Sequence, residues 1–322
     1  MQPTTPILHF PNDLAQATAF IKAGECVAIK TETVYGLAAD ASNEDAVRSI
    51  FKAKARPATN PLIVHIASIA DMKKWARDIP SKAYLLAEKY WPGPLSLLLK
   101  KQPWVSDTVT GGQDTVVLRI PASNDFLSLI KAAGVGLAAP SANKYKFISP
   151  TCAAHVLTSL HGRIAAVVDG GRAEVGIEST IVDVTGEAPC ILRPGPIDRD
   201  SLKHDLQTEV TFKNNEGLTV PGSVLQHYQP NTLVKMLSQN ALVQKRFTKG
   251  EGLIALSPCT WPLEKRNHIQ LSSTPKEYGR DFYDALHQLD KQGLSCIYIE
   301  ALPNTDSWFA LNNRLSRVVA LG

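Results

Sequence analysis

Short apolar runs alternate with helical patterns along the first two-thirds of this 322-residue chain, and no other feature constrains the fold as strongly. The runs that predict strands are CVAIK (26–30), LIVHI (62–66), LSLLL (95–99), TVVLRI (115–120), VGLAA (135–139), IAAVVD (164–169) and TIVDV (180–184). Helical patterns are expected from the Asn12-Asp13 cap to Gly24, after Asn43, and at 81–90, 123–133 and 151–160. Strands that alternate with helices in this way predict an α/β sandwich built on a mixed sheet.

The rest of the chain predicts a linker and then a second, smaller unit. Residues 201–225 are polar and interrupted by NNEG and PG, which is typical of a linker or flap. After Tyr228 the expected elements are a strand at 252–257, a helix near 275–291, a strand at 296–301 and a helix near 307–320. We therefore expect a first domain at 1–205, a linker or flap at 206–230, and a C-terminal α/β domain at 231–322.

Composition narrows the environment and the kind of ligand. The five cysteines are scattered and none forms a C-x-x-C pair, which argues against a zinc site or a disulfide framework and fits a reducing, cytoplasmic environment. No apolar stretch approaches the ~18 residues of a membrane span, and no signal peptide is recognised, so no membrane association is expected. The net charge of +4 suits an anionic ligand such as a nucleotide, but it is too small to argue for nucleic acid alone.

The common nucleotide-binding motifs do not explain such a ligand. The chain has no G-x-x-x-x-G-K-[ST], so any ATP is not held by a P-loop. Residues 134–139, GVGLAA, match G-x-G-x-x-A formally, but they follow a helix and run into Pro140. A dinucleotide-binding turn instead follows a strand and opens a helix, so this match predicts no such site.

Charged side chains gather around one expected strand. In KAKARPATNPLIVHI (52–66), the cations taken alone are typical of a solvated helix end. The Asn-Pro pair at Asn60 is typical of a turn, and His65 is typical of a histidine at a strand end whose ring is hydrogen-bonded within the protein. Arg119 is different, because it lies inside an apolar strand and a buried guanidinium needs an anionic partner. The acid nearest to it in sequence is Asp114, and a ligand carboxylate or phosphate is the alternative.

Small polar residues accompany the ends of further expected strands. APSAN (139–143) places Ser141 and Asn143 on the same side of an extended segment. GIESTIVD carries Ser179 before a strand, and RPGPI puts Arg193 before a proline-locked corner. Each of these is individually typical of a turn or a helix cap. Together they indicate a ligand site at the strand ends, where α/β sheets build such sites.

These motifs in combination resemble those of a known family. KTETVYGLAADA (30–41), KAKARPATNPLIVHI, WPGPLSLLL (91–99), VVLRIP, APSAN with SPT (139–151), GIESTIVD (176–183) and LRPGPI occur in the order and spacing of a YrdC-type domain. With HYQP in the spacer and an α/β unit after it, the chain resembles the long, two-domain form of the L-threonylcarbamoyladenylate synthases. The resemblance implies an α/β fold with a YrdC-like twisted mixed sheet and helices around a concave basic cavity, plus a smaller, Rossmann-like C-terminal domain.

The resemblance also implies a reaction and its partners. In that family L-threonine, bicarbonate or CO2, and ATP give threonylcarbamoyl-AMP and diphosphate in the cytoplasm, for the threonylcarbamoyladenosine (t6A) modification of tRNA. Mg2+ is expected with the ATP, held mainly by phosphates and water without a dedicated protein site. A downstream tRNA threonylcarbamoyltransferase is an expected partner, and direct tRNA binding stays open.

The family's functional residues can be carried onto the matching positions of this sequence. The expected catalytic residues are Lys54, Arg56, Ser141 and Asn143. The expected contacts with L-threonine are Thr33, His65, Arg119, Ala139 and Ser179. The expected contacts with ATP are Arg56, Asn60, Thr115, Ser141, Ser149, Arg193 and the spacer's Tyr228.

The residue types suit this chemistry. Arg119 can grip the threonine carboxylate through two parallel hydrogen bonds. The threonine amine must be uncharged to capture CO2, so no carboxylate should stabilise an ammonium there. Lys54 and Arg56 can neutralise phosphates while Ser141 and Asn143 orient them, and no nucleophile or general base of the chain is required.

Two other functions are weighed against this one. A nucleic-acid-binding module is disfavoured by an aromatic content of 7% and by the lack of interleaved arginine and aromatic residues. A carbamoyltransferase related to hydrogenase maturation factors would need cysteine-rich zinc segments and an acylphosphatase-like unit, and the sequence has neither.

Overall fold

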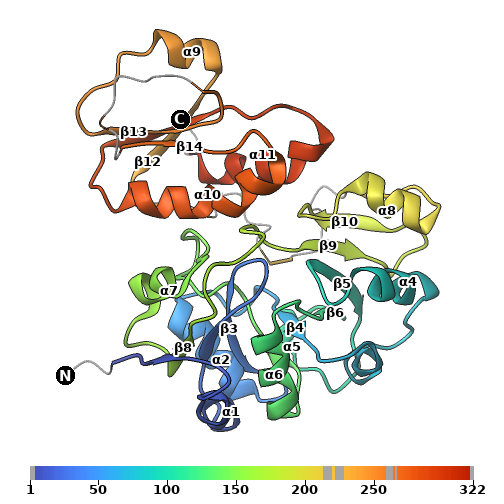
Figure 1. Cartoon of the computed structure of the whole chain (residues 1–322). Coiled ribbons are helices and arrows are strands. Elements are labelled where there is room, and N and C mark those ends of the chain that lie inside the picture. The colour runs from blue at the N-terminus through green and yellow to red at the C-terminus, as the bar shows by residue number, and fades with distance from the viewer. Residues whose placement is uncertain (1–3, 213–219, 222–227, 259–263, 265–266, 320–322) are drawn as a thin grey trace.

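The computed structural model describes residues 4–212, 220–221, 228–258, 264 and 267–319. The described strands form two sheets, one with 11 strands and one with four. Figure 1 shows the two units that result, a large one from the first two-thirds of the chain and a smaller one from the last third. No helix in the described ranges is long and apolar enough to cross a membrane.

The large sheet mixes parallel and antiparallel pairs in the order β1-β8-β2-β3-β7-β4-β6-β5-β9-β10-β11. Its strands are β1 (Ile7–Leu8), β2 (Val27–Lys30), β3 (Tyr35–Asp40), β4 (Ile63–His65), β5 (Leu95–Lys100), β6 (Thr115–Arg119), β7 (Leu137–Ala138), β8 (Ala166–Val168), β9 (Thr180–Asp183), β10 (Cys190–Arg193) and β11 (Thr211–Phe212). Consecutive residues of a strand face opposite sides. In β2, Ala28 accordingly packs into one apolar cluster, and Val27 and Ile29 pack into another.

Helices cover the large sheet and account for both clusters. They are α1 (Leu14–Lys22), α2 (Glu44–Lys54), α3 (Met72–Trp75), α4 (Ser81–Tyr90), α5 (Asp107–Thr110), α6 (Asn124–Ala133), α7 (Ala153–Leu160) and α8 (Arg199–Leu206), with a 3-10 turn at Ile69–Asp71. Residues of α1 and α6 belong to one cluster, whereas α2, α4 and α7 contribute to the other. The sheet is therefore buried on two sides.

Helix α2 illustrates how local sequence positions the site. The Asn43 side chain accepts hydrogen bonds from the backbone N–H groups of Asp45 and Ala46, which satisfies donors that a helix start leaves free. The helix ends at Lys54, because Ala55 adopts a left-handed conformation with φ of 50°. This turn directs the chain toward Arg56 and then into β4.

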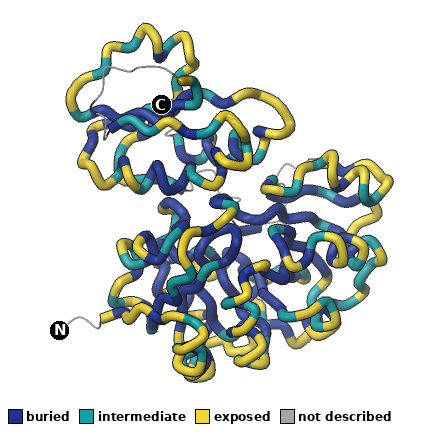
Figure 2. Tube along the Cα trace, in the orientation of Figure 1, coloured by how far each residue is buried: buried dark blue, intermediate teal, exposed yellow. Residues whose placement is uncertain are grey.

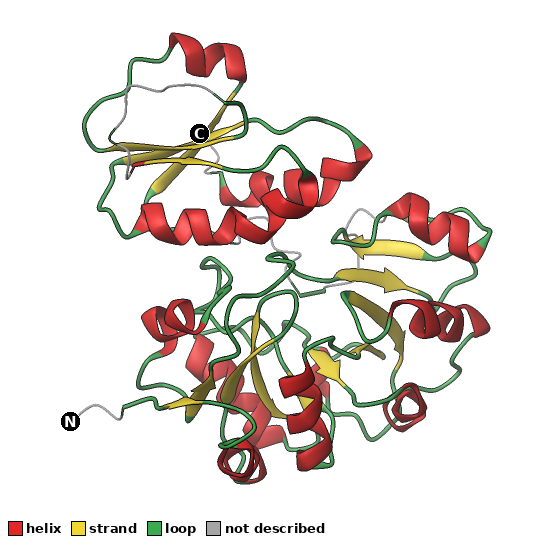
Figure 3. Cartoon of the chain, in the orientation of Figure 1, coloured by secondary structure: helices red, strands yellow, loops and turns green. Residues whose placement is uncertain are grey.

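The smaller unit is a parallel four-stranded sheet in the order β12-β15-β13-β14. Its elements are β12 (Leu233–Leu237), α9 (Gln239–Gln244), β13 (Glu251–Ala255), β14 (His268–Gln270), α10 (Pro275–Asp290), β15 (Cys296–Glu300), a 3-10 turn (Asp306–Trp308) and α11 (Phe309–Val318). Helices α10 and α11 lie between this sheet and the large unit (Figures 1 and 3).

The two units share one apolar cluster. Val34, Ile148 and Ile177 of the large unit pack with residues of α10 and α11, among them Tyr283 and Leu311. Figure 2 shows buried chain where the two units face each other. The smaller unit is thus packed against the large one through a hydrophobic contact rather than tethered by the linker alone.

The α/β fold with a mixed sheet and a second α/β unit is confirmed. Two details of the sequence interpretation are wrong. YGLAAD, for which no strand was expected, forms the interior strand β3, and the start of the expected 201–225 linker completes α8 and pairs β11 with β10. The domain boundaries at 205 and 230 stay predictions.

Candidate functional site

Most of the expected site residues line one small pocket of about 50 Å3 beside β4 and β6, two interior strands of the large sheet. Those on its wall are Thr33, Arg56, His65, Arg119, Ala139, Ser141, Ser179, Arg193 and Tyr228. They come from the turn before β3, the chain after α2, the ends of β4, β6 and β10, and the segments after β7 and before β9. Residues far apart in sequence therefore meet because the order of the strands in the sheet brings these segments together.

Lys54 and Asn143 lie behind the pocket rather than on its wall. The Lys54 ammonium donates hydrogen bonds to the backbone oxygen of Ser141 and, at 2.5 Å, to that of Asn143. The Asn143 amide nitrogen donates to the backbone oxygens of Lys144 and Phe147, each at 2.8 Å. Burial, and then the nearby Arg56, hold the pKa of Lys54 well below its usual value. The structure gives these two residues contacts that hold the turn on which Ser141 lies.

Three further expected residues also lie off the wall. The Asn60 amide nitrogen donates to the backbone oxygen of Pro57 at 3.3 Å. Thr115 starts β6, and its buried hydroxyl has no hydrogen-bond partner within the described part of the chain. The hydroxyl of Ser149 donates to Glu178 Oε1 at 2.6 Å, so it contacts the pocket through a wall residue.

Arg119 is held by three groups of the protein. Its Nε donates to the backbone oxygen of Gly93 and its Nη1 to the Thr33 hydroxyl, both at 3.0 Å. Its Nη2 lies 2.6 Å from Glu32 Oε1 in an ion pair that is almost completely buried. Asp114, the acid suggested by proximity in sequence, instead pairs with Arg77 at 2.8 Å. The anionic partner is thus a protein residue, and Asp114 was the wrong candidate.

Glu178 is a second buried carboxylate on the pocket wall, and its partners come from both units. Oε1 accepts from Ser149, and Oε2 lies 2.7 Å from Nε of Arg314 and 3.3 Å from the Tyr283 hydroxyl. Burial alone would raise the pKa of this carboxyl, but Arg314 and Arg193 outweigh burial and lower the pKa to about 2. Glu178 is therefore ionised and neutralised at neutral pH.

Arg56 and Arg193 give the pocket its positive charge. Arg193 donates from Nε and Nη2 to the backbone oxygen and hydroxyl of Ser179, and from Nη1 to Pro221. Arg56 donates to the backbone oxygen of Pro61. Neither arginine forms an ion pair with a carboxylate of the described residues. Burial lowers the pKa of each to about 10, so both remain cationic at neutral pH.

His65 and Tyr145 complete the electrostatic character of the site. Burial, and then Arg119, keep the pKa of His65 well below its usual value, so its imidazole is neutral at pH 7. The ring lies against Phe126 with a centroid distance of 5.1 Å. Tyr145, from the loop after Ser-x-Asn, places its ring 6.0 Å from the Arg56 guanidinium, an aromatic contact that suits a buried cation.

The segments around Glu178 and Arg193 are packed too tightly for any side chain at Gly195. A Cβ added there would lie 2.4 Å from the Thr180 nitrogen and 2.8 Å from the Glu178 oxygen. Glycine is therefore required by close backbone approach. The two segments form one wall, with the small pocket on one side.

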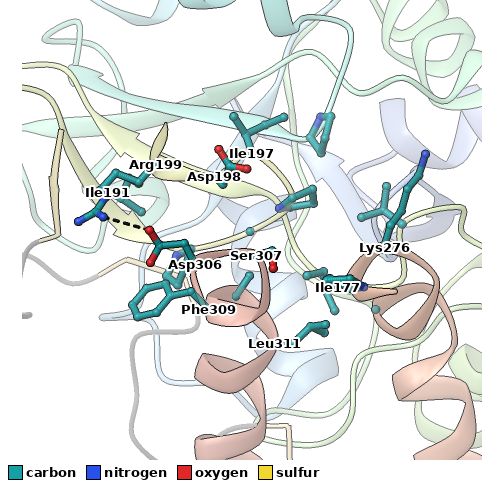
Figure 4. A pocket seen from close by; sticks show the side chains of 18 of the residues that line it. Ile177, Ile191, Ile197, Asp198, Arg199, Lys276, Asp306, Ser307, Phe309 and Leu311 are labelled. Carbon is teal, nitrogen blue, oxygen red and sulfur yellow. Dashed lines mark hydrogen bonds and ion pairs between the residues drawn. The ribbon is translucent and has the colours of Figure 1, made fainter. Parts of the chain in front are cut away.

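A larger cavity of about 460 Å3 lies between the two units, and it contains none of the expected site residues. Its lining is mostly apolar, with Ile177, Ile197 and Leu311 among the side chains shown in Figure 4. Arg199 and Asp306 form an ion pair of 3.2 Å at its margin. Because the expected site residues line the small pocket and none of them lines this cavity, we place the chemistry in the small pocket.

Sequence reasoning missed Glu32, Glu178 and Arg314. Glu32 and Glu178 occur inside the quoted motifs KTETVYG and GIEST, and an acid within such a buried turn signals a partner cation. No local pattern indicates which cation it is. Arg314 lies in a helix whose other face is solvated, so its sequence context suggests an ordinary surface residue.

Two family models match the chain. The model described as telomere recombination, Sua5_yciO_yrdC, matches residues 19–195, and the one described as threonylcarbamoyl-AMP synthase, C-terminal domain, matches residues 187–320. The chain is 36% identical over 315 residues to the threonylcarbamoyl-AMP synthase of Pyrococcus abyssi, covering 94% of this chain and 92% of that relative. It is also 36% identical over 323 residues to the Bacillus subtilis protein of the same name, with the same coverage of 94% and 92%.

A solved structure agrees with these matches. The crystal structure of P. abyssi Sua5 complexed with L-threonine superposes with a TM-score of 0.88 at 33% identity. The match covers 99% of this chain and 100% of that one, so both units are included.

Proposed function

The chain belongs to the threonylcarbamoyl-AMP synthase family, and we propose that it condenses L-threonine, bicarbonate or CO2, and ATP into threonylcarbamoyl-AMP with release of diphosphate. It is thus an adenylate-forming nucleotidyltransferase whose product serves the t6A modification of tRNA. The main structural support for this reaction is one pocket that is lined by two cationic arginines, Arg56 and Arg193, and by Arg119, which is paired with Glu32.

At one end of the pocket, Arg119 binds the threonine carboxylate. A guanidinium has five N–H donors, and hydrogen bonds to Gly93 and Thr33 use two of those on Arg119. Nη2 lies in an ion pair with Glu32 but makes no hydrogen bond among the described residues, so enough donors remain for the paired hydrogen bonds that a carboxylate accepts. The neutral His65 and the hydroxyl of Ser179 line the same pocket and contact the rest of the amino acid.

The threonine amine must carry a lone pair when it captures CO2. Glu32 and Glu178 are close, but each is ion-paired with an arginine, so neither is free to stabilise an ammonium. The amine nitrogen then bonds to the carbon of CO2, releases a proton to solvent and becomes a carbamate. These two ion pairs support a neutral amine in the pocket.

At the other end, a carbamate oxygen attacks the α-phosphorus of ATP. The bond from that phosphorus to its bridging oxygen breaks, and diphosphate leaves with the electron pair. Such a step depends on positioning and charge stabilisation. Arg56 and Arg193 stabilise the phosphate charge, and the Ser141 hydroxyl orients a phosphate oxygen. Lys54 and Asn143 act by holding the turn of Ser141.

ATP enters as its Mg2+ complex, with the metal held by phosphates and water. In the described ranges, no three His, Cys, Asp or Glu side chains are grouped to hold a metal ion. The pocket's volume of about 50 Å3 is far below the ~300–1,000 Å3 of typical ligand sites. Tyr228 and Pro221, which line the pocket, must therefore move outward to admit ATP.

The proposal is tested by measuring diphosphate release with each substrate omitted in turn. Release is expected only when ATP, L-threonine and bicarbonate are all present. Equal release without L-threonine would overturn the assignment. A titration with tRNA across salt concentrations separates the alternative function, because tight, steeply salt-dependent binding without threonine-dependent ATP consumption would indicate a nucleic-acid binder.

We place the reaction in the cytoplasm, next to a downstream tRNA threonylcarbamoyltransferase that consumes the adenylate. A mixed anhydride of this kind is readily hydrolysed, so direct transfer to the second enzyme would conserve it. Pull-down of the transferase, with and without the substrates, tests that partnership.

A further inference from the structure

We propose that Arg314, in helix α11 of the smaller unit, is a positioning residue of the synthase site that neutralises Glu178 and thereby keeps Arg193 available to the triphosphate of ATP. The inference rests on the proposed function and deepens it, because it gives the smaller unit a part in binding ATP.

The geometry places Arg314 directly behind the pocket wall. Its side chain is 1% exposed, and its Nε lies 2.7 Å from Glu178 Oε2. Its Nη2 donates to the backbone oxygen of Pro194 at 2.9 Å, so the same guanidinium holds the residue next to Arg193. Its Cζ lies 5.6 Å from the centre of the Tyr228 ring. One side chain of the smaller unit therefore contacts two segments of the wall and one aromatic that lines the pocket.

The charges show why a neutralising group is needed at this point. Glu178, Arg193 and Arg56 all line the same pocket, where the interior screens charge weakly. An unpaired carboxylate there would attract the Arg193 guanidinium and repel the anionic phosphates. With Arg314 in place, the Glu178–Arg314 ion pair has no net charge. Glu178 still orients the Ser149 hydroxyl, which donates to it at 2.6 Å.

Docking of the smaller unit does not depend on Arg314 alone. The imidazoles of His155 and His287 stack across the interface with centroids 3.8 Å apart, and Arg172 pairs with Asp284 of α10 at 2.6 Å. His287 Nε2 also lies 3.2 Å from the Ser149 oxygen. Loss of the Arg314 charge is therefore expected to change the pocket while the two units stay together.

The experiment compares Arg314→Met with the double variant Arg314→Met/Glu178→Gln in the full-length protein. The methionine removes the charge and keeps much of the volume, so it leaves Glu178 unpaired. We expect the KM for ATP to rise at least about tenfold in the single variant, with a much smaller change in the KM for L-threonine. The double variant removes the unpaired charge, and we expect it to recover most of the lost ATP affinity. Arg172→Met, which breaks an interface ion pair away from the pocket, should keep the wild-type KM for ATP.

Each other outcome has a definite meaning. If Arg314→Met keeps the wild-type KM for ATP while the wild type is active, or if the double variant is no better than the single one, the inference is wrong. If Arg314→Met does not fold, the double variant alone decides, because a folded double variant that binds a non-hydrolysable ATP analogue near the wild-type affinity supports the charge argument and one that does not contradicts it. Failure of the proposed function appears separately, as wild-type protein that releases no threonine-dependent diphosphate.

Discussion

Glu32 Oε1 lies 2.6 Å from Nη2 of Arg119, although the two residues belong to a turn and a strand that are far apart in sequence. This buried pair is one of two at the pocket, and Glu178 with Arg314 is the other. In both cases an arginine neutralises the charge of a carboxylate beside the site. The site must bind an amine in its uncharged form and a highly anionic nucleotide. The pairs thus set the charge of the pocket as well as its shape.

The first prediction concerns Arg119. Arg119→Met should abolish measurable L-threonine binding, because the carboxylate loses its paired donors, and it should lower the free energy of unfolding by about 3–5 kcal/mol because Glu32 stays buried and unpaired. The double variant Glu32→Gln/Arg119→Met should regain most of that stability and still not bind threonine. Isothermal titration calorimetry and denaturant unfolding measure the two effects. Threonine affinity that survives in either variant would exclude Arg119 from substrate binding.

The second prediction separates Arg56 from an ordinary surface arginine. Arg56→Met should reduce threonine-dependent diphosphate release by two orders of magnitude or more, roughly the effect of removing one charge-stabilising donor at a reacting centre. Arg48 lies in α2, is largely exposed and pairs with Glu44 one helical turn earlier, at 2.9 Å. Because such exposed pairs contribute little, Arg48→Met should keep full activity. A similar loss in both variants would point to a general charge effect instead.

The third prediction distinguishes support from direct contact. Lys54 donates to the backbone oxygens of Ser141 and Asn143, and the Ser141 oxygen also accepts from the Asn143 N–H at 3.0 Å. Lys54→Met therefore removes one donor from each oxygen and should lower the free energy of unfolding by about 1–3 kcal/mol, mainly through the buried oxygen of Asn143. The Arg56→Met variant should lose much less stability. Thermal unfolding of the two variants side by side makes the comparison. If Lys54→Met unfolds like the wild type but loses all activity, Lys54 contacts the phosphates directly.

The fourth prediction follows from the histidines at the interface. Burial, the largest cause, lowers the pKa of His155 to about 3 and that of His287 to about 4. Besides each other, the charged groups near them are Asp284, Arg172, Lys291 and Asp290. The pKa of histidine in an unfolded chain is ~6.5, so below that pH the unfolded state binds protons that the two histidines of the folded interface do not bind.

Stability should therefore be constant above about pH 6.5 and fall as the pH drops toward 4. His155→Gln, which cannot be protonated, should show a smaller drop in Tm between pH 7 and pH 5 than the wild type. Equal drops in both proteins would mean that these histidines do not control the acid sensitivity.

Much of the fold follows from local sequence. The cap at Asn43 and the apolar spacing of Val47 and Ile50 predict α2, and the apolar runs predict β4, β5 and β6. Strand β3 was missed because its residues are apolar on both faces and follow a polar turn, a pattern without the alternation of a half-buried strand. Strand β11 has only two residues, too few for any periodicity.

The site was predictable as a set of residues but not as a set of contacts. Motifs in register predict that Arg56, His65 and Arg119 belong to one site; all three line the same pocket, and their roles there stay predictions. The partners of the buried acids depend on packing between distant segments, since Arg314 and Glu178 are 136 residues apart. No local pattern specifies such a pair, and only the arrangement of the two units does.

The proposed condensation is tested most directly by mass spectrometry of the product made from 13C-bicarbonate, L-threonine and ATP. We expect an adenylate that carries both threonine and the labelled carbon, formed together with one equivalent of diphosphate, and no such adenylate when threonine is omitted. An adenylate without the label, or diphosphate released without any threonine-containing product, would contradict it.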